Sequence, residues 1–220
     1  MVRPRLLDLF CGAGGAAMGY HRAGFDVVGV DINPQPHYPF EFIQADAMTF
    51  PLDGFDAIHA SPPCQAYSPH VSSSDSRWVP TRGKAEPRLI AAIRERIAGR
   101  PYAIENVYGA RGALAWPVLL CGSMFGLPIA RHRLFEVMGR PCPALPHPDC
   151  RGIAKAYAAQ RGWDYRDMTV TGKGRRAGTS ARWAEIMGID WPMRQRDYSE
   201  AIPPAYTEWI GHRLIEVLDA

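Results

Sequence analysis

Arg5-Leu6-Leu7-Asp8-Leu9-Phe10-Cys11-Gly12-Ala13-Gly14-Gly15 is a short apolar run that ends in a glycine-rich turn. The run predicts a buried β-strand, and the residues after it, 16–23, predict a helix that ends at Gly24. A strand, a glycine turn and a helix in this order are typical of the first unit of a doubly wound α/β sheet. Ligands of such sheets bind beyond the carboxyl ends of the strands, so the turn marks a candidate binding crevice.

The alternation of strands and helices continues along the chain. Further strands are predicted at 27–31, 41–45, 56–60, 102–105 and 134–137, and helices at 181–187 and 205–218, around the turn Ile202-Pro203-Pro204. This order predicts a mostly parallel, twisted sheet with helices on both faces. Two segments break the pattern: 62–87 reads as a long loop rich in Pro, Ser, Arg and Gly, and 140–178 as an irregular stretch with a basic, glycine-rich tip.

Composition narrows the class of protein. The chain has 220 residues, which fits one domain or one domain with a small appendage. A net charge of +3 permits a nucleic-acid partner without requiring one. The 5 cysteines are an odd number at scattered spacings, so we expect reduced thiols in a cytoplasm rather than a disulfide framework. No signal peptide and no membrane span is expected, because apolar runs of ~20 residues are missing from the sequence.

Two aspartates follow strands beside the glycine turn. Asp31 ends the second predicted strand, where its carboxylate can accept hydrogen bonds from ribose hydroxyls, and Asp46 follows the third, within reach of an adenine amino group. The turn has no Gly-Lys-Ser run for phosphates, which disfavours an NTPase. The residues therefore fit a nucleoside cofactor without phosphates, and the alternative is a purely structural tight turn.

A second group of residues carries candidate chemistry. Cys64 follows the fourth predicted strand between stiffening prolines, and Glu105 ends the fifth, next to it in a parallel sheet. A carboxyl group beside a thiol suits acid-assisted nucleophilic attack. Arg131 and Arg133 lie on the same side of an extended segment and could face the same pocket. The alternatives are a buried structural thiol, a helix-capping acid and two solvated arginines.

The order of these motifs resembles that of the cytosine-C5 DNA methyltransferase family. The similar segments are Phe10-Cys11-Gly12-Ala13-Gly14-Gly15, Pro63-Cys64-Gln65, Glu105-Asn106-Val107, Arg131-x-Arg133, and Ile202-Pro203-Pro204-Ala205-Tyr206 with Ile210-Gly211. The resemblance extends from residue 5 to about 215 and implies a Rossmann-like methyltransferase fold that uses S-adenosylmethionine. The chain departs from the family at Ile129, where Gln is usual, and at a Pro in the last motif, where Asn is frequent.

The resemblance also implies a role for each residue. Cys64 is the expected nucleophile, Glu105 holds cytosine N3, and Arg133, supported by Arg131, holds O2. The expected cofactor-binding residues are Phe10, Gly12, Gly14, Gly15, Asp31, Ile32, Asp46, Ala47, Pro63, Pro203 and Pro204. The expected DNA-binding residues are Gln65, Ser68, Arg77, Arg82, Lys173, Arg175 and Arg176. The target cytosine must leave the duplex by base flipping.

The short chain indicates a compact, phage- or bacterial-type member of that family, of the kind found in restriction-modification. Residues 1–139 and 179–220 form the expected catalytic domain, and residues 140–178 a small insert for target recognition. We expect a cytoplasmic monomer that acts on double-stranded DNA, either alone or with a protein partner that supplies part of the site recognition.

Several alternatives stay open. The chain could methylate transfer RNA, or it could be a non-catalytic regulatory homologue, although Cys64, Glu105 and Arg133 together argue against the latter. Cys142, His147 and Cys150 could hold zinc, with Cys121 unengaged, but their spacing lacks the usual paired knuckles. Packing of a proline-rich loop is the expected explanation of this group, and no metal is expected.

Overall fold

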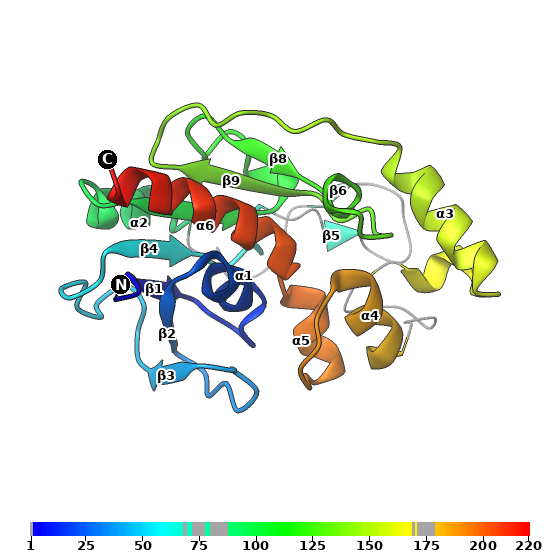
Figure 1. The fold of residues 1–220 in the computed structure, drawn as a ribbon, viewed down its shortest axis with the longest axis horizontal. Helices are drawn as coiled ribbons and strands as arrows, with labels where there is room; N and C mark the ends of the chain where they lie inside the picture. Colours follow the sequence, from blue (N-terminus) through cyan, green and yellow to red (C-terminus); the bar gives the residue numbers. More distant parts are fainter. Residues whose placement is uncertain (1, 68–69, 72–77, 80–87, 169, 171–178) are drawn as a thin grey trace.

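A seven-stranded sheet forms the centre of the molecule (Figure 1). The computed structural model describes residues 2–67, 70–71, 78–79, 88–168, 170 and 179–220. The sheet order is β3 (Glu41–Gln44), β2 (Asp26–Asp31), β1 (Arg5–Leu9), β4 (Ala57–Ala60), β7 (Tyr102–Asn106), β9 (Arg133–Val137) and β8 (Val118–Leu120). Neighbours from β3 to β7 are parallel, and β9 runs antiparallel to both β7 and β8. The predicted mostly parallel sheet is confirmed.

Helices cover both faces of this sheet, as predicted. Because side chains alternate along a strand, Leu6 of β1 faces the core under α1 (Gly15–Ala23) and α6 (Pro204–Leu218). Leu7 and Leu9 face the opposite core, which α2 (Ile90–Ile97) covers with its buried isoleucines. The helix α2 and the strand β8 were not expected from the sequence. A separate pair of short strands, β5 (His70–Val71) and β6 (Trp78–Val79), lies within the long loop predicted at 62–87.

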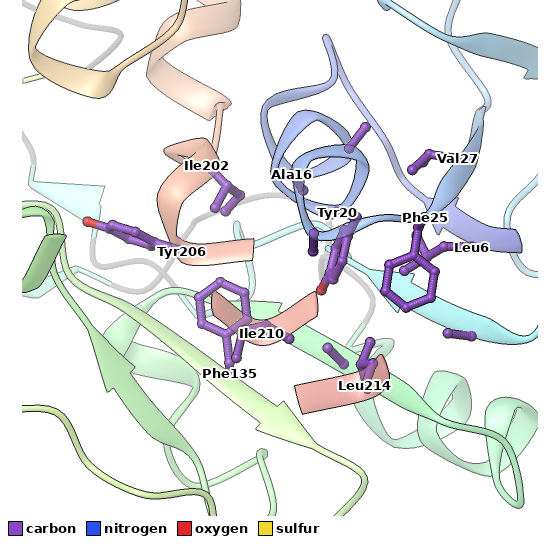
Figure 2. Close-up of a cluster of buried hydrophobic side chains, with 14 of the residues drawn as sticks. Leu6, Ala16, Tyr20, Phe25, Val27, Phe135, Ile202, Tyr206, Ile210 and Leu214 are labelled. Atoms are coloured by element: carbon purple, nitrogen blue, oxygen red, sulfur yellow. The ribbon is translucent and has the colours of Figure 1, made fainter. Parts of the chain in front are cut away.

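The helices α1 and α6 pack against each other at unusually close range. Figure 2 shows Ile210 and Leu214 of α6 beside Tyr20 of α1 and Phe135 of β9. Gly19 permits this approach, because a Cβ there would overlap the Pro204 carbonyl oxygen and the Thr207 hydroxyl. That hydroxyl donates a hydrogen bond to the Ala16 carbonyl at 2.8 Å. The first and last helices of the fold are therefore one packed unit.

The segment predicted to be irregular at 140–178 contains a regular helix, so that expectation was wrong. The helix is α3 (Cys150–Gln160), and it begins where the Asp149 side chain accepts a hydrogen bond from the Gly152 amide at 3.0 Å. Its alanines favour a helix, and Ala154 and Ala158 are buried. The proline-rich residues before it hid this signal.

A third hydrophobic cluster forms a small lobe beside the sheet (Figure 1). It joins α3 and the 3-10 helix η3 (Tyr165–Met168) with α4 (Ser180–Met187) and α5 (Gln195–Glu200), around the fully buried Trp183. Two further 3-10 helices, η1 (Tyr108–Ala110) and η2 (Gly122–Phe125), follow β7 and β8. None of the described helices is both long and apolar enough to cross a membrane.

Gly19→Ala is expected to lower the free energy of unfolding by about 1–3 kcal/mol, because the added methyl group forces α1 and α6 apart. The control is Gly112→Ala, where a Cβ meets nothing within 4 Å. Urea denaturation of both variants measures the difference. Equal stability of the two variants would contradict the close packing.

Candidate active site

The carboxyl ends of β4 and β7 bring Cys64 and Glu105 to the same edge of the sheet. Ala60 pairs with Ile104 in parallel register, so the residues that follow them, Ser61 and Glu105, are neighbours. Cys64 lies a few residues beyond β4 and is half-buried. The Asn106 side chain donates to the Pro62 carbonyl at 2.9 Å and so holds the cysteine loop against β7.

Glu105 forms a buried ion pair at this edge. Its Oε1 lies 3.1 Å from Nε of Arg133, and the glutamate is 6 % exposed. Burial raises the pKa of Glu105 above its ordinary value, while the Arg133 charge and a hydrogen bond from Ser61 pull it back. The ion pair, which was not predicted from the sequence, thus places a carboxyl group that can exchange a proton at the end of β7.

A buried chain of hydrogen bonds leads from Glu105 to α1. The Ser61 hydroxyl lies 2.8 Å from Nε2 of His59, and Nδ1 of His59 lies 2.9 Å from the Tyr20 hydroxyl. Burial lowers the pKa of His59 to about 3, so its ring is neutral. If Ser61 donates to the glutamate, His59 donates to Ser61 and accepts from Tyr20. Sequence reasoning missed this chain, whose signal is a histidine inside an apolar strand.

Arg131 is buried and binds backbone rather than Glu105. Its guanidinium donates to the carbonyls of Val170, Ser199 and Ala201 at 3.1, 2.7 and 2.8 Å. Burial lowers its pKa to about 9, and its Nε has no partner among the described residues. Arg131 thus joins the sheet to the small lobe and to the segment before α6, while Arg133 faces the glutamate.

The glycine turn and Asp31 form one unit at the ends of β1 and β2. The Gly12 amide donates to Asp31 Oδ2 at 3.2 Å, and the Asn33 amide to Oδ1 at 2.9 Å. Phe10 has φ 59, a left-handed conformation that non-glycine residues rarely adopt. A Cβ on Gly15 would lie 2.5 Å from the Ile202 carbonyl oxygen, so the turn touches the segment that precedes α6.

The other predicted cofactor residues surround this unit. Ile32 follows Asp31 and is 66 % exposed, an apolar surface that suits the flat face of an adenine ring. Asp46 is exposed, and its Oδ1 accepts from the Met48 amide at 2.8 Å. Of the remaining positions, Gly14 has a φ of 87°. Ala47, Pro203 and Pro204 are buried, and Pro63 is half-buried. A nucleoside thus fits the residues at these strand ends.

Most of the predicted DNA contacts belong to segments that the structure does not describe. Gln65 is exposed in the turn after Cys64. The other predicted contacts, Ser68, Arg77, Arg82, Lys173, Arg175 and Arg176, lie outside the described residues.

A known protein family matches the part of the chain that contains Cys64 and Glu105. Residues 4–111 match the model of the C-5 cytosine-specific DNA methylase family. This segment is a C-5 cytosine-specific DNA methylase domain. The resemblance noted in the sequence is confirmed, and the methylase domain contains the glycine turn, Cys64 and Glu105. The protein is a methyltransferase, and S-adenosylmethionine is its methyl donor. No curated protein gives a significant sequence match.

Solved structures share the fold over nearly the whole chain. A predicted DNA modification methyltransferase encoded within an Escherichia coli prophage gives a TM-score of 0.62 at 16% identity, covering 99% of this chain and 100% of its own. The Schizosaccharomyces pombe Dnmt2 methyltransferase gives 0.58 at 14%, covering 100% of both chains. The Entamoeba histolytica methyltransferase EhMeth gives 0.63 at 11%, covering 99% of both. At these identities the likeness shows the fold alone.

Asp8 is a buried acid in the middle of β1 that sequence reasoning did not single out. The Tyr38 hydroxyl donates to its Oδ2 at 3.3 Å, and its Oδ1 has no partner among the described residues. Burial raises the pKa of Asp8 to about 8 from 3.8. The folded methylase domain therefore keeps a proton on Asp8 that the unfolded chain releases.

Asp8→Asn is expected to flatten the pH dependence of stability between about pH 4 and pH 8. In this window the native wild type binds more protons than the unfolded chain, so its stability falls as the pH rises, by up to about 1.4 kcal/mol per pH unit. The amide variant has no such proton to lose. Urea titrations at several pH values measure both slopes, with Asp53→Asn as the exposed control. Parallel curves for wild type and Asp8→Asn would mean that Asp8 ionises normally.

Proposed function

We propose that the protein is a DNA (cytosine-5)-methyltransferase in which Cys64 bonds to C6 of a flipped-out cytosine. The observation that carries this proposal is the buried Glu105–Arg133 ion pair at the sheet edge that adjoins the Cys64 loop. Nucleophilic attack on a pyrimidine ring requires a thiol as nucleophile, a carboxyl group that exchanges a proton and a guanidinium that binds a ring oxygen. The description of the matching family favours DNA over RNA as the substrate.

Each of the three residues acts at a different edge of the base. The Cys64 thiolate adds to C6, which breaks the aromaticity of the ring and moves electron density toward N3 and C5. Glu105 stabilises that density by a hydrogen bond or a proton at N3, for which a raised carboxyl pKa is suitable. Arg133, fixed by its ion pair with Glu105, donates to O2.

The residues at the strand ends hold the methyl donor. Asp31 would accept from the ribose hydroxyls, Asp46 from the adenine amino group, and Phe10 and Ile32 would contact the ring. S-adenosylmethionine supplies, when bound, an electrophilic methyl group for the activated C5 carbon. A water molecule then takes the C5 proton, the electrons of the C5–H bond form the C5–C6 double bond, and the C6–sulfur bond breaks with its electron pair on Cys64, which leaves as a thiolate.

Residues 140–178 form the proposed target-recognition insert, whose helices α3 and η3 belong to the small lobe. Its helix α3 exposes Arg151 and Lys155, one turn apart, which sequence reasoning did not single out. Basic side chains of this kind contact phosphates and add affinity without sequence information. The short insert has room for few contacts to base edges, so we expect a short recognition site unless a partner protein supplies more.

Cys64→Ser is expected to abolish methyl transfer and to leave S-adenosylmethionine binding intact, because an alcohol is a far weaker nucleophile than a thiolate. Methyl transfer to duplex DNA measures the first effect and calorimetry the second. Wild-type protein should also form a covalent adduct with DNA containing 5-fluorocytosine, because fluorine at C5 does not leave as a proton does. The matched control is Cys142→Ser, a half-buried cysteine outside the proposed site. Normal turnover by Cys64→Ser would exclude covalent catalysis through this residue.

Methylation mapping with the purified protein is expected to show DNA cytosines methylated in a context of about two to four base pairs, since each well-formed base contact adds only ~1–3 kcal/mol of discrimination. Bisulfite sequencing of treated plasmid DNA measures the context, and transfer RNA serves as the competing substrate. Methylation of transfer RNA alone would refute the DNA substrate. A strict recognition site of about six or more base pairs would need more base contacts than a short insert can supply, and would refute the prediction of a short site.

A further inference from the structure

Four metal-binding side chains meet where the small lobe joins the sheet. Among the described residues, Cys121, His132, His147 and Cys150 have their ligand atoms within 4.8 Å of one another. Cys121 follows β8, His132 precedes β9, and Cys150 is the first residue of α3, three positions after His147. Both cysteines are buried and both are free thiols, and His147 is exposed. Together the four residues form a Cys2His2 cluster.

The sheet register explains why two members of the cluster adjoin. Leu120 of β8 pairs with Arg133 of β9 in antiparallel register, so the next residues, Cys121 and His132, again face each other. The proline-rich segment after β9 then returns His147 and Cys150 to the same point. Sequence reasoning instead grouped Cys142 with these two. In the structure Cys142 lines a pocket with Met138, Arg213 and Glu216 and is not part of the cluster.

The distances within the cluster match the edges of a tetrahedral zinc site. The Nε2 atoms of His132 and His147 are 3.3 Å apart, and Sγ of Cys150 is 3.7 Å from Nε2 of His132. Ordinary Zn–N and Zn–S bond lengths give edges of about 3.3 Å between two nitrogens and about 3.6 Å between nitrogen and sulfur. All ligand atoms of the cluster lie within 4.8 Å of one another, which is about 1 Å above a sulfur–sulfur edge.

We propose that Cys121, His132, His147 and Cys150 bind one structural zinc ion. Two thiolates and two imidazoles form a closed four-ligand set, which leaves no position for substrate and is typical of structural rather than catalytic zinc. The ion links the end of β8, the start of β9 and the first turn of α3. It therefore fixes the small lobe to the sheet.

The position of His132 also connects the zinc site with the base-binding arginine. His132 lies between Arg131 and Arg133, and alternate residues of an extended segment point to opposite sides. Holding the imidazole on one side fixes the two guanidinium groups on the other.

The test is the metal content of untagged protein, purified with reducing agent and without added metal. We expect inductively coupled plasma mass spectrometry to find about one zinc ion per chain. His147→Asn and Cys150→Ser should reduce that content to near zero, and His147 is exposed, so its replacement leaves the core intact. The matched controls, Cys142→Ser and the exposed His212→Asn, should keep the full content.

Cobalt substitution reports the ligands directly. Wild-type protein with Co²⁺ in place of zinc should show the visible bands of a tetrahedral site and a sulfur-to-cobalt charge-transfer band. Cys150→Ser should lose about half of the charge-transfer intensity if it still binds cobalt, because one of the two thiolates is missing. A chelator should lower the Tm of the wild type and leave that of His147→Asn unchanged.

Three results would overturn the proposal. One is wild-type protein that contains no zinc and takes up none when it is added. Another is a disulfide between Cys121 and Cys150, found by peptide mass spectrometry in protein from reducing cells. The third is loss of zinc in Cys142→Ser equal to that in Cys150→Ser. None of these readouts depends on methyl transfer, so the zinc site and the proposed function can fail independently.

Discussion

The buried charge of Arg131 is the constraint on which the assembly of this molecule depends. A guanidinium taken out of water needs acceptors for its donors, and three carbonyls from two distant segments supply them to its two terminal nitrogens, while its Nε has no partner among the described residues. The Tyr206 hydroxyl, from the first turn of α6, donates in turn to the Arg131 carbonyl at 2.6 Å. Arg131 therefore holds the sheet, the small lobe and the C-terminal helix together. It lies two positions before Arg133, which pairs with Glu105.

Much of the fold could be predicted because strands and amphipathic helices have local signatures. The run at residues 5–9 and its glycine turn identified the first unit, and the order of later strands followed from the same periodicity. The helix α2 was missed because its apolar residues directly follow the loop at 62–87 and are interrupted by Arg94 and Arg96. The strand β8 is only 3 residues long, and its place at the edge is fixed by pairing with β9, a contact that no local pattern encodes.

The candidate site was predictable where chemistry depends on residue type at the end of a strand. Glu105 and Arg133 were expected to act on one base, and they form an ion pair in the structure. Their neighbours His59 and Ser61 were not found, because the hydrogen bonds that link them to Glu105 of β7 and to Tyr20 of α1 depend on how distant parts of the chain pack in space. The Cys2His2 cluster was grouped wrongly for the same reason: Cys142 is near His147 in sequence, whereas Cys121 and His132 are near it in space.

The pairing of α1 with α6 also constrains the order of events during synthesis. The hydrogen bond between Thr207 and Ala16 joins positions separated by 191 residues. The apolar surface of α1, with Ala17 and Tyr20 fully buried in the native state, lacks its partner until α6 is made. Contacts at such separation slow folding, since a long loop must close before they form. A nascent chain would therefore expose this apolar surface on the ribosome, where chaperones that recognise apolar helices would bind it.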